Sequence, residues 1–304
     1  MRPTNAEHAE HVEPGNVDLV ARDRDELPVA WREAGPVGGE LVVLLHGLGG
    51  SRIAWEPQLA ALSAAGYLAA AWDMPGYGAS PPPPVWSFEA LAADAATWIS
   101  GFGSGAAHVV GLSMGGMVAL HLALAEPTLV RSLVLSDTSP AFGFDGSTEA
   151  ETWIEARLAP IRAGATPASM ATGVLGSIMA PASTAVADAA AAMARIGPAA
   201  FEGAVGCVTS HDVRHRLADI AAPTLVVVGE HDRETPPSYA RHLADAIPRS
   251  RYVEIAGAGH ISNLERPEQF NTALLDFLAF DDRAGLDDRA GLDDRAGGGG
   301  SAGA

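Results

Sequence analysis

The sequence contains no lysine, so all 19 of its basic residues are arginines. Enzymes that form a Schiff base with a substrate or with pyridoxal phosphate need a lysine amine, and Ser–Lys hydrolases use one as their base. The phosphate-binding P-loop also contains an obligatory lysine. The absence of lysine therefore excludes all of these mechanisms.

Cysteine and long apolar runs are also scarce. The single cysteine, Cys207, cannot form an internal disulfide. A membrane-spanning helix needs a run of about 18 or more apolar residues, and the most apolar stretch, residues 59–72, is interrupted by Ser63 and Gly66. The first 16 residues are polar and lack the apolar core of a signal peptide. We therefore expect a cytoplasmic protein that does not cross a membrane.

Positive charge is outnumbered, because 37 acidic residues against 19 basic ones give a net charge of −18. A chain with this charge is repelled by nucleic acids and by anionic membrane surfaces. Hydrophobic residues make up 48% of the chain, which is enough for a packed core and excludes a wholly disordered protein. We expect a small-molecule partner and no nucleic-acid or membrane partner, while nothing in the sequence indicates an oligomeric state.

The apolar pattern predicts an α/β fold. Runs typical of strands occur at residues 17–21, 28–33, 41–46, 67–72, 108–112, 132–135, 224–229 and 251–255. Helical patterns lie among them at residues 54–65, 87–101, 114–125, 238–247 and 267–279. This alternation indicates a mostly parallel, eight-stranded sheet with helices on both faces. The first two runs, joined by a polar turn at residues 23–27, are predicted to form a hairpin at one edge.

Other segments depart from this alternation. Residues 140–215 are rich in Ala, Met, Gly and Pro and look helical throughout, so we expect a cap inserted between two core segments, 17–139 and 216–280. Such a cap would cover the strand ends where open α/β sheets bind ligands. Residues 1–16 are predicted to be a flexible arm. Residues 281–304 repeat the hexapeptide DDRAGL and end in glycines, which predicts a disordered, low-complexity tail.

A serine motif provides the first candidate for chemistry. Residues 111–115 read Gly-Leu-Ser-Met-Gly and fit G-x-S-x-G, with a predicted strand before Ser113 and a predicted helix after it. This context holds the serine on a sharp strand-to-helix turn, beside the N–H groups of the helix N-terminus. Ser301 also lies in a G-x-S-x-G match, but within a glycine-rich tail that has neither element. Ser113 is therefore the predicted nucleophile.

A nucleophilic serine needs a base and an acid that orients the base. His260 follows the last predicted strand, and Asp232 follows the strand before it, so the chain order is Ser, Asp, His. Asp137, which follows the strand at residues 132–135, is the alternative acid. The glycine-rich turn after the strand at 41–46 can fold toward the serine, and the backbone N–H groups of Leu48 and Met114 are the predicted oxyanion-hole donors.

Five motifs in this order resemble the α/β-hydrolase superfamily, and the resemblance covers about residues 17–279. They are Leu44–Gly47, Asp73–Gly78, Gly111–Gly116, Gly229–Asp232 and Gly257–His260. A serine at the nucleophile position is unlike the aspartate of haloalkane dehalogenases and epoxide hydrolases. Within the superfamily, further stretches are most similar to 3-oxoadipate enol-lactonases. These stretches are Gly111–Met117, Val134–Thr138, Ile161–Gly164 and Cys207–Arg214.

The resemblance implies a serine hydrolase that cleaves a carboxylic ester or a lactone through Ser113, His260 and Asp232, by way of an acyl-enzyme. Such a mechanism needs no metal and no organic cofactor. The cap would line the substrate pocket, with Phe142, Trp153 and Met179 as candidates. The cap arginines, Arg157 among them, are expected to be solvated. The same catalytic residues would also suit a cofactor-free perhydrolase or haloperoxidase, or a C–C bond hydrolase. A ligand receptor without catalysis is a further alternative on this fold.

Overall fold

The structure is a computed structural model that describes residues 21–25, 28–146, 148–181 and 183–279. The arm and the tail predicted at residues 1–16 and 281–304 lie outside the described residues. Within the described part, eight strands form one sheet in the order β1-β2-β4-β3-β5-β6-β7-β8. The strands are β1 (Arg22–Arg24), β2 (Trp31–Ala34), β3 (Leu41–Leu45), β4 (Leu68–Trp72), β5 (Ala107–Leu112), β6 (Val130–Ser136), β7 (Thr224–Gly229) and β8 (Ser250–Ile255).

The predicted mostly parallel sheet is confirmed. Strands β3 to β8 pair in parallel, while β2 pairs in antiparallel fashion with β1 on one side and with β4 on the other. Strand β3 reads Leu-Val-Val-Leu-Leu and is buried throughout. Its side chains alternate between two apolar clusters, with Val42 and Leu44 in one and Val43 and Leu45 in the other. A strand buried on both faces requires a continuous apolar run of this kind.

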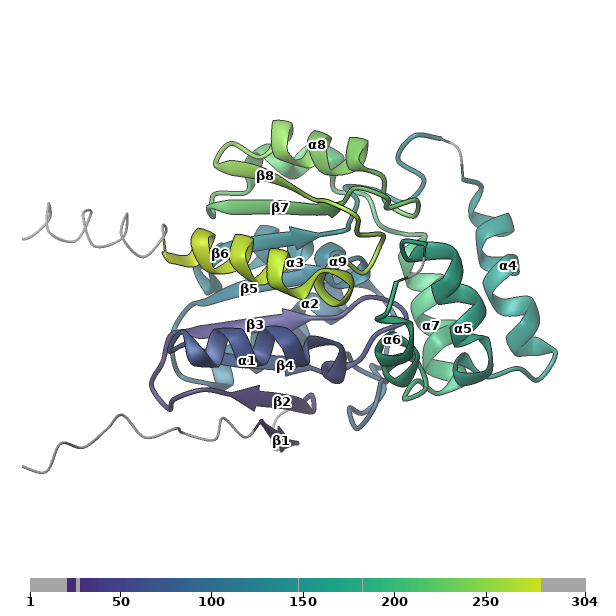
Figure 1. Cartoon of the computed structure of the whole chain (residues 1–304), viewed down its shortest axis with the longest axis horizontal. Coiled ribbons are helices and arrows are strands. Elements are labelled where there is room, and N and C mark those ends of the chain that lie inside the picture. The colour runs from purple at the N-terminus through teal and green to yellow at the C-terminus, as the bar shows by residue number, and fades with distance from the viewer. Residues whose placement is uncertain (1–20, 26–27, 147, 182, 280–304) are drawn as a thin grey trace, which may run out of the picture.

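Helices cover both faces of the sheet (Figure 1). One face packs against α1 (Glu56–Ala64) and the helix at residues 267–279, which contribute Leu62 and Phe270. The other face packs against α2 (Phe88–Gly101), α3 (Met114–Ala125) and α8 (Pro237–Ala246), with Trp98 and Leu243 among their buried side chains. The short helix α9 (Ser262–Glu265) precedes the helix at 267–279. Within the described residues, no helix is both long enough and apolar enough to cross a membrane.

The N-terminal edge of the sheet differs from the prediction. The polar stretch predicted to be a turn at residues 23–27 overlaps β1, and most of the strand predicted at 17–21 lies outside the described residues. Ion pairs across the hairpin join Arg24 to Glu33 at 2.9 Å and Arg32 to Asp23 at 3.1 Å. An edge strand faces water and can be charged. A search for apolar runs therefore misplaced this strand by several residues.

The cap is inserted between β6 and β7. It contains the helices α4 (Ala150–Arg162), α5 (Pro167–Ile178), α6 (Val186–Met193) and α7 (Pro198–Val208). At its base the two chain segments are hydrogen-bonded, with the Phe142 N–H donating to His211 O and the Val213 N–H to Pro140 O. In Figure 1 the cap lies beyond the carboxyl ends of the parallel strands.

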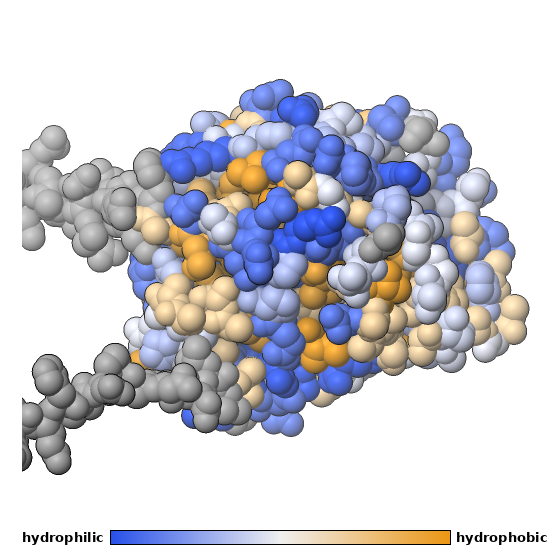
Figure 2. Space-filling model, viewed as in Figure 1, coloured by the Kyte–Doolittle hydropathy of each residue, from blue (hydrophilic) through white to orange (hydrophobic). Residues whose placement is uncertain are grey.

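The surface of the cap differs from that of the core in composition. In Figure 2, hydrophilic residues gather over α8, whereas paler and tan residues cover much of the cap. Small residues account for this, because α6 has the sequence VADAAAAM and α7 has the sequence PAAFEGAVGCV. In this view the cap is therefore less hydrophilic than the surface over α8.

Candidate active site

Ser113 occupies a strained turn between β5 and α3. Its φ of 53° and ψ of −120° lie in a region that L-residues rarely adopt. Glycines make the turn possible, because a Cβ on Gly111 would lie 2.4 Å from the carbonyl oxygen of Gly115, and one on Gly115 would lie 2.1 Å from that of Leu45. Thr138 Oγ1 donates a hydrogen bond to the Ser113 carbonyl at 2.7 Å. The two glycines of the sequence motif are thus sterically required by the turn.

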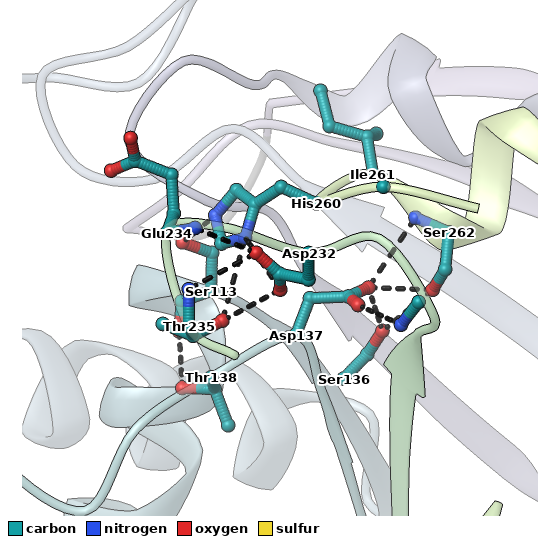
Figure 3. A network of polar contacts seen from close by, with 12 residues as sticks. Ser113, Ser136, Asp137, Thr138, Asp232, Glu234, Thr235, His260, Ile261 and Ser262 are labelled. Carbon is teal, nitrogen blue, oxygen red and sulfur yellow. Dashed lines mark hydrogen bonds and ion pairs between the residues drawn. The ribbon is translucent and has the colours of Figure 1, made fainter. Parts of the chain in front are cut away.

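The structure brings Ser113, His260 and Asp232 into one hydrogen-bonded chain (Figure 3). His260 Nε2 lies 2.9 Å from Ser113 Oγ. His260 Nδ1 lies 3.0 Å and 2.9 Å from the two carboxylate oxygens of Asp232. Because a carboxylate accepts hydrogen bonds, Nδ1 carries the proton and Nε2 is left to accept the serine proton. The arrangement can therefore transfer a proton from the hydroxyl to the imidazole.

Asp232 is held in place by its own loop. Its Oδ1 accepts the backbone N–H groups of Glu234 at 2.9 Å and Thr235 at 3.0 Å, and its Oδ2 accepts the Thr235 hydroxyl at 2.8 Å. Burial lowers the pKa of His260, but the charge of Asp232 and the hydrogen bond to it outweigh burial and raise this pKa to about 9. The carboxylate therefore favours the imidazolium that would form during proton transfer.

Asp137, the alternative acid, is buried close by but does not contact His260. One oxygen accepts the Gly229 N–H at 2.8 Å, and the other accepts the Ser262 hydroxyl at 2.5 Å. Burial raises the pKa of Asp137 to about 7, and the nearby charge of Asp232 adds to the increase. Asp137 therefore joins the loop of Asp232 to the segment that follows His260, and Asp232 is the carboxylate in contact with the imidazole.

The glycine-rich loop after β3 packs directly against Ser113. A Cβ on Gly47 would lie 3.0 Å from Ser113 Cβ. The Tyr77 hydroxyl donates to the Leu48 carbonyl at 2.7 Å and so fixes the loop. Met114 is the first residue of α3, where backbone N–H groups have no partner within the helix. Leu48 and Met114 both line the cavity that contains Ser113 in its wall.

A cavity of about 350 Å³ lies between the core and the cap, with Ser113 and His260 in its wall. Most of the remaining wall is apolar and comes from the cap. Phe142 and Trp153, both predicted to line the pocket, do so and meet edge to face with ring centroids 5.3 Å apart. The other large apolar side chains that the cap contributes are Met170, Val174, Leu175, Ile178, Met193, Phe201 and Val208.

Met179, the third predicted pocket residue, is not among the described residues that line the cavity. Helix α5 ends at Ile178, and Met179 is already extended, with φ −84° and ψ 162°. This change of backbone direction leaves Ile178 in the cavity wall, while Met179 is buried in the main apolar core. The prediction failed because apolar composition cannot distinguish these two neighbours.

Glu265, which no pattern in the sequence predicted, is buried at the junction of cap and core. One carboxylate oxygen accepts the backbone N–H groups of Gly259 at 3.1 Å and Ile261 at 3.2 Å, on either side of His260. The other accepts the N–H of Ala180, just after α5, at 2.7 Å. The only hint in the sequence is a glutamate five residues after the histidine, which spacing alone does not distinguish from a surface charge.

The cap also contacts the histidine loop directly. The backbone N–H of His260 donates to the carbonyl of Ile178 at 3.0 Å. A Cβ on Gly259 would lie 2.5 Å from the Ala180 nitrogen, so only glycine permits this approach. The segment at the end of α5 therefore contacts the histidine loop both at His260 and at Gly259.

Comparisons with known proteins show the family to which the chain belongs. A family model described as alpha/beta hydrolase fold matches residues 40–267. The chain belongs to the α/β-hydrolase family. Among curated relatives, RutD of Variovorax paradoxus, a candidate carbamate hydrolase, is 32% identical over 263 residues, covering 83% of this chain and 97% of RutD. A pimeloyl-[acyl-carrier protein] methyl ester esterase of Neisseria meningitidis is 31% identical, covering 84% of this chain and 97% of the esterase.

A solved structure extends the likeness. The enol-lactonase of Burkholderia xenovorans superposes with a TM-score of 0.74 at 27% identity, covering 83% of this chain and 97% of the enol-lactonase. The resemblance to the α/β-hydrolase superfamily and to its enol-lactonase-like group is thus confirmed. The protein is an enzyme of this family.

Proposed function

We propose that the protein is a serine hydrolase that cleaves a carboxylic ester or a lactone through an acyl-enzyme. The observation that carries this proposal is the 2.9 Å contact between His260 Nε2 and Ser113 Oγ, with Asp232 on the opposite ring nitrogen. A weakly nucleophilic hydroxyl needs this arrangement in order to attack a carbonyl carbon. The ester and lactone chemistry named for two of the proteins above is consistent with it.

The first half of the reaction forms the acyl-enzyme. Ser113 Oγ attacks the carbonyl carbon, while His260 Nε2 takes the hydroxyl proton and Asp232 stabilises the resulting imidazolium. The carbonyl oxygen becomes an oxyanion, to which the backbone N–H groups of Leu48 and Met114 would donate. Loss of one such donor typically slows a hydrolase by about 100- to 1000-fold. The tetrahedral intermediate then collapses, and the departing alkoxide takes the proton from His260.

The second half releases the acid. A water molecule gives its proton to His260 and attacks the acyl carbon, and Ser113 leaves with that proton restored. In a lactone the leaving alkoxide stays attached to the acyl group, so one ring-opened hydroxy acid is released. Every proton passes through His260, and the cycle needs no group beyond these side chains and water.

The test is labelling of the folded protein with a fluorophosphonate, followed by intact mass and peptide mapping. We expect a single adduct on Ser113 and none on Ser301, which lies in the second G-x-S-x-G sequence. Ser113→Ala should lose the adduct and lower phenyl acetate hydrolysis by at least about a thousandfold. An unlabelled but folded protein would contradict the proposal. Perhydrolysis, an alternative for the same residues, is measured on the same preparation with peroxide and acetate.

A further inference from the structure

We propose that the cavity accepts an uncharged, apolar acyl group, and that Glu234 excludes acyl groups that carry a carboxylate. This inference rests on the proposed ester hydrolysis, because it concerns the acid part of the same substrate. The relevant part of the cavity wall is formed by α4 and the loop after β7. On this wall the aromatic rings of the cap meet the charged residues that line the cavity.

The first support is the balance of charge around the cavity. Among the described lining residues, the cations other than the His260 imidazole are Arg157 and Arg233. Arg233 is exposed to solvent, whereas the Arg157 side chain is only 25% exposed. The Arg157 Nη2 donates to Glu234 Oε2 at 2.8 Å. The one cation that is partly buried in this wall is therefore already neutralised by a carboxylate of the chain itself.

The second support is the way Arg157 is fixed. Its guanidinium carbon lies 3.8 Å from the centre of the Trp153 ring, in a cation–π contact. Trp153 is in turn packed against Phe142. Burial lowers the pKa of Arg157, and the charge of Glu234 opposes this effect. Arg157 is therefore held between the Trp153 ring and the Glu234 carboxylate, within the wall of the cavity.

The third support is the position of Glu234. Its backbone N–H donates to Asp232 Oδ1, so the residue is held two positions from the acid that orients His260 (Figure 3). A substrate carboxylate that approached Arg157 would have to displace Glu234 or lie beside it. Like charges placed side by side are unfavourable, and water screens this repulsion only in part, because the side chain of Glu234 is 36% exposed. An apolar group meets no such opposition, since the rest of the cap wall is apolar.

The experiment compares two methyl esters of the same length and shape. One is monomethyl adipate, and the other has an isopropyl group in place of the free carboxylate. We expect the wild type to hydrolyse the uncharged ester with a kcat/KM at least roughly tenfold higher. Glu234→Gln frees Arg157 and should shift this ratio about tenfold toward the acid, mainly through a lower KM for monomethyl adipate. Adding Arg157→Met to that variant should abolish the shift.

The decisive quantity is the ratio of kcat/KM for the uncharged ester to kcat/KM for monomethyl adipate. The negative charge of Glu234 also raises the pKa of His260, but this effect is common to both esters and cancels in their ratio. A matched control is Glu155→Gln, which removes the acid of the exposed Arg162–Glu155 pair on the same helix and should leave the ratio unchanged. Melting curves would establish that each variant is folded.

The outcomes separate this inference from the proposed function. A wild type that hydrolyses both esters equally well, or a Glu234→Gln variant with an unchanged ratio, overturns the role of Glu234 while ester hydrolysis stands. Absence of turnover with either ester and with phenyl acetate overturns the proposed hydrolysis and this inference with it. A ratio that shifts about tenfold toward the acid in Glu234→Gln alone, with the shift lost again on adding Arg157→Met, supports the role assigned to the pair.

Discussion

The core and the cap of this enzyme are specified by its sequence in different ways. In the core, Ser113 follows directly on β5, and Asp232 and His260 lie in the loops after β7 and β8. Gly111 and Gly115 are required there, because a Cβ at either position would clash with a backbone oxygen. In the cap, helices rich in alanine contribute an apolar wall to the cavity. The proposed chemistry therefore depends on a few fixed atoms of the core, whereas we expect the selection of substrate to depend on the shape of the cap wall.

The largest expected effect lies in the core. Asp232→Asn leaves a hydrogen-bonding group beside His260 but favours the wrong tautomer, so kcat should fall by about 10⁴-fold for every ester. The measurement is kcat across a series of acyl lengths. Asp137→Asn is the matched control, because this buried aspartate does not touch the imidazole. An equal loss in both variants would mean that the two carboxylates share the role assigned here to Asp232.

An intermediate effect is expected where the two regions meet. Glu265→Gln loses one acceptor, so either the Ala180 N–H or the N–H groups beside His260 lose their partner. We expect roughly a tenfold slower fluorophosphonate reaction at Ser113, because misplaced catalytic groups cost rate steeply. The pH profile of kcat/KM should also move to lower pH, since the His260 pKa of about 9 requires close contact with Asp232.

Two readouts distinguish positioning by Glu265 from a merely structural role. Amide exchange at Ala180, Gly259 and Ile261 should quicken, and the pH profile should shift. Glu268→Gln, at an exposed glutamate on the following helix, should change neither. Loss of thermal stability with an unchanged pH profile would assign Glu265 to the fold alone.

The smallest catalytic effect is expected in the cap. Met193 lines the cavity, and its sulfur lies 3.8 Å from the point where a Cβ on Gly49 would be. Met193→Ala should change acetate ester hydrolysis by no more than about threefold while raising the relative rate for longer acyl chains. Deletion of such a buried side chain typically costs about 2–5 kcal/mol of stability, so the melting temperature should fall. A loss of kcat that is equal for all chain lengths would remove the contrast between core and cap.

The same contrast explains what the sequence could predict. The parallel strands and the grouping of Ser113, Asp232 and His260 follow from apolar runs and from motifs at strand ends, because the carboxyl ends of parallel strands meet at one edge. The position of the charged strand β1 could not be predicted from apolar runs, because its pairing depends on cross-strand ion pairs. Met179 and Ile178 could not be separated by composition. Glu265 and the Arg157–Glu234 pair depend on contacts between distant segments that no local pattern records.

The bonds between α5 and the histidine loop have a consequence for how substrate and product pass. Movement of α5 away from the core would break the bond from the His260 N–H to Ile178 and the bond from Ala180 to Glu265. If the cap opened on the α5 side, the loop that carries His260, the proposed base, would lose these hydrogen bonds. We therefore expect substrate and product to pass along α4, where separation of Arg157 from Glu234 would break no hydrogen bond of His260. The same two side chains would then both permit the passage of substrate and discriminate against charged acyl groups.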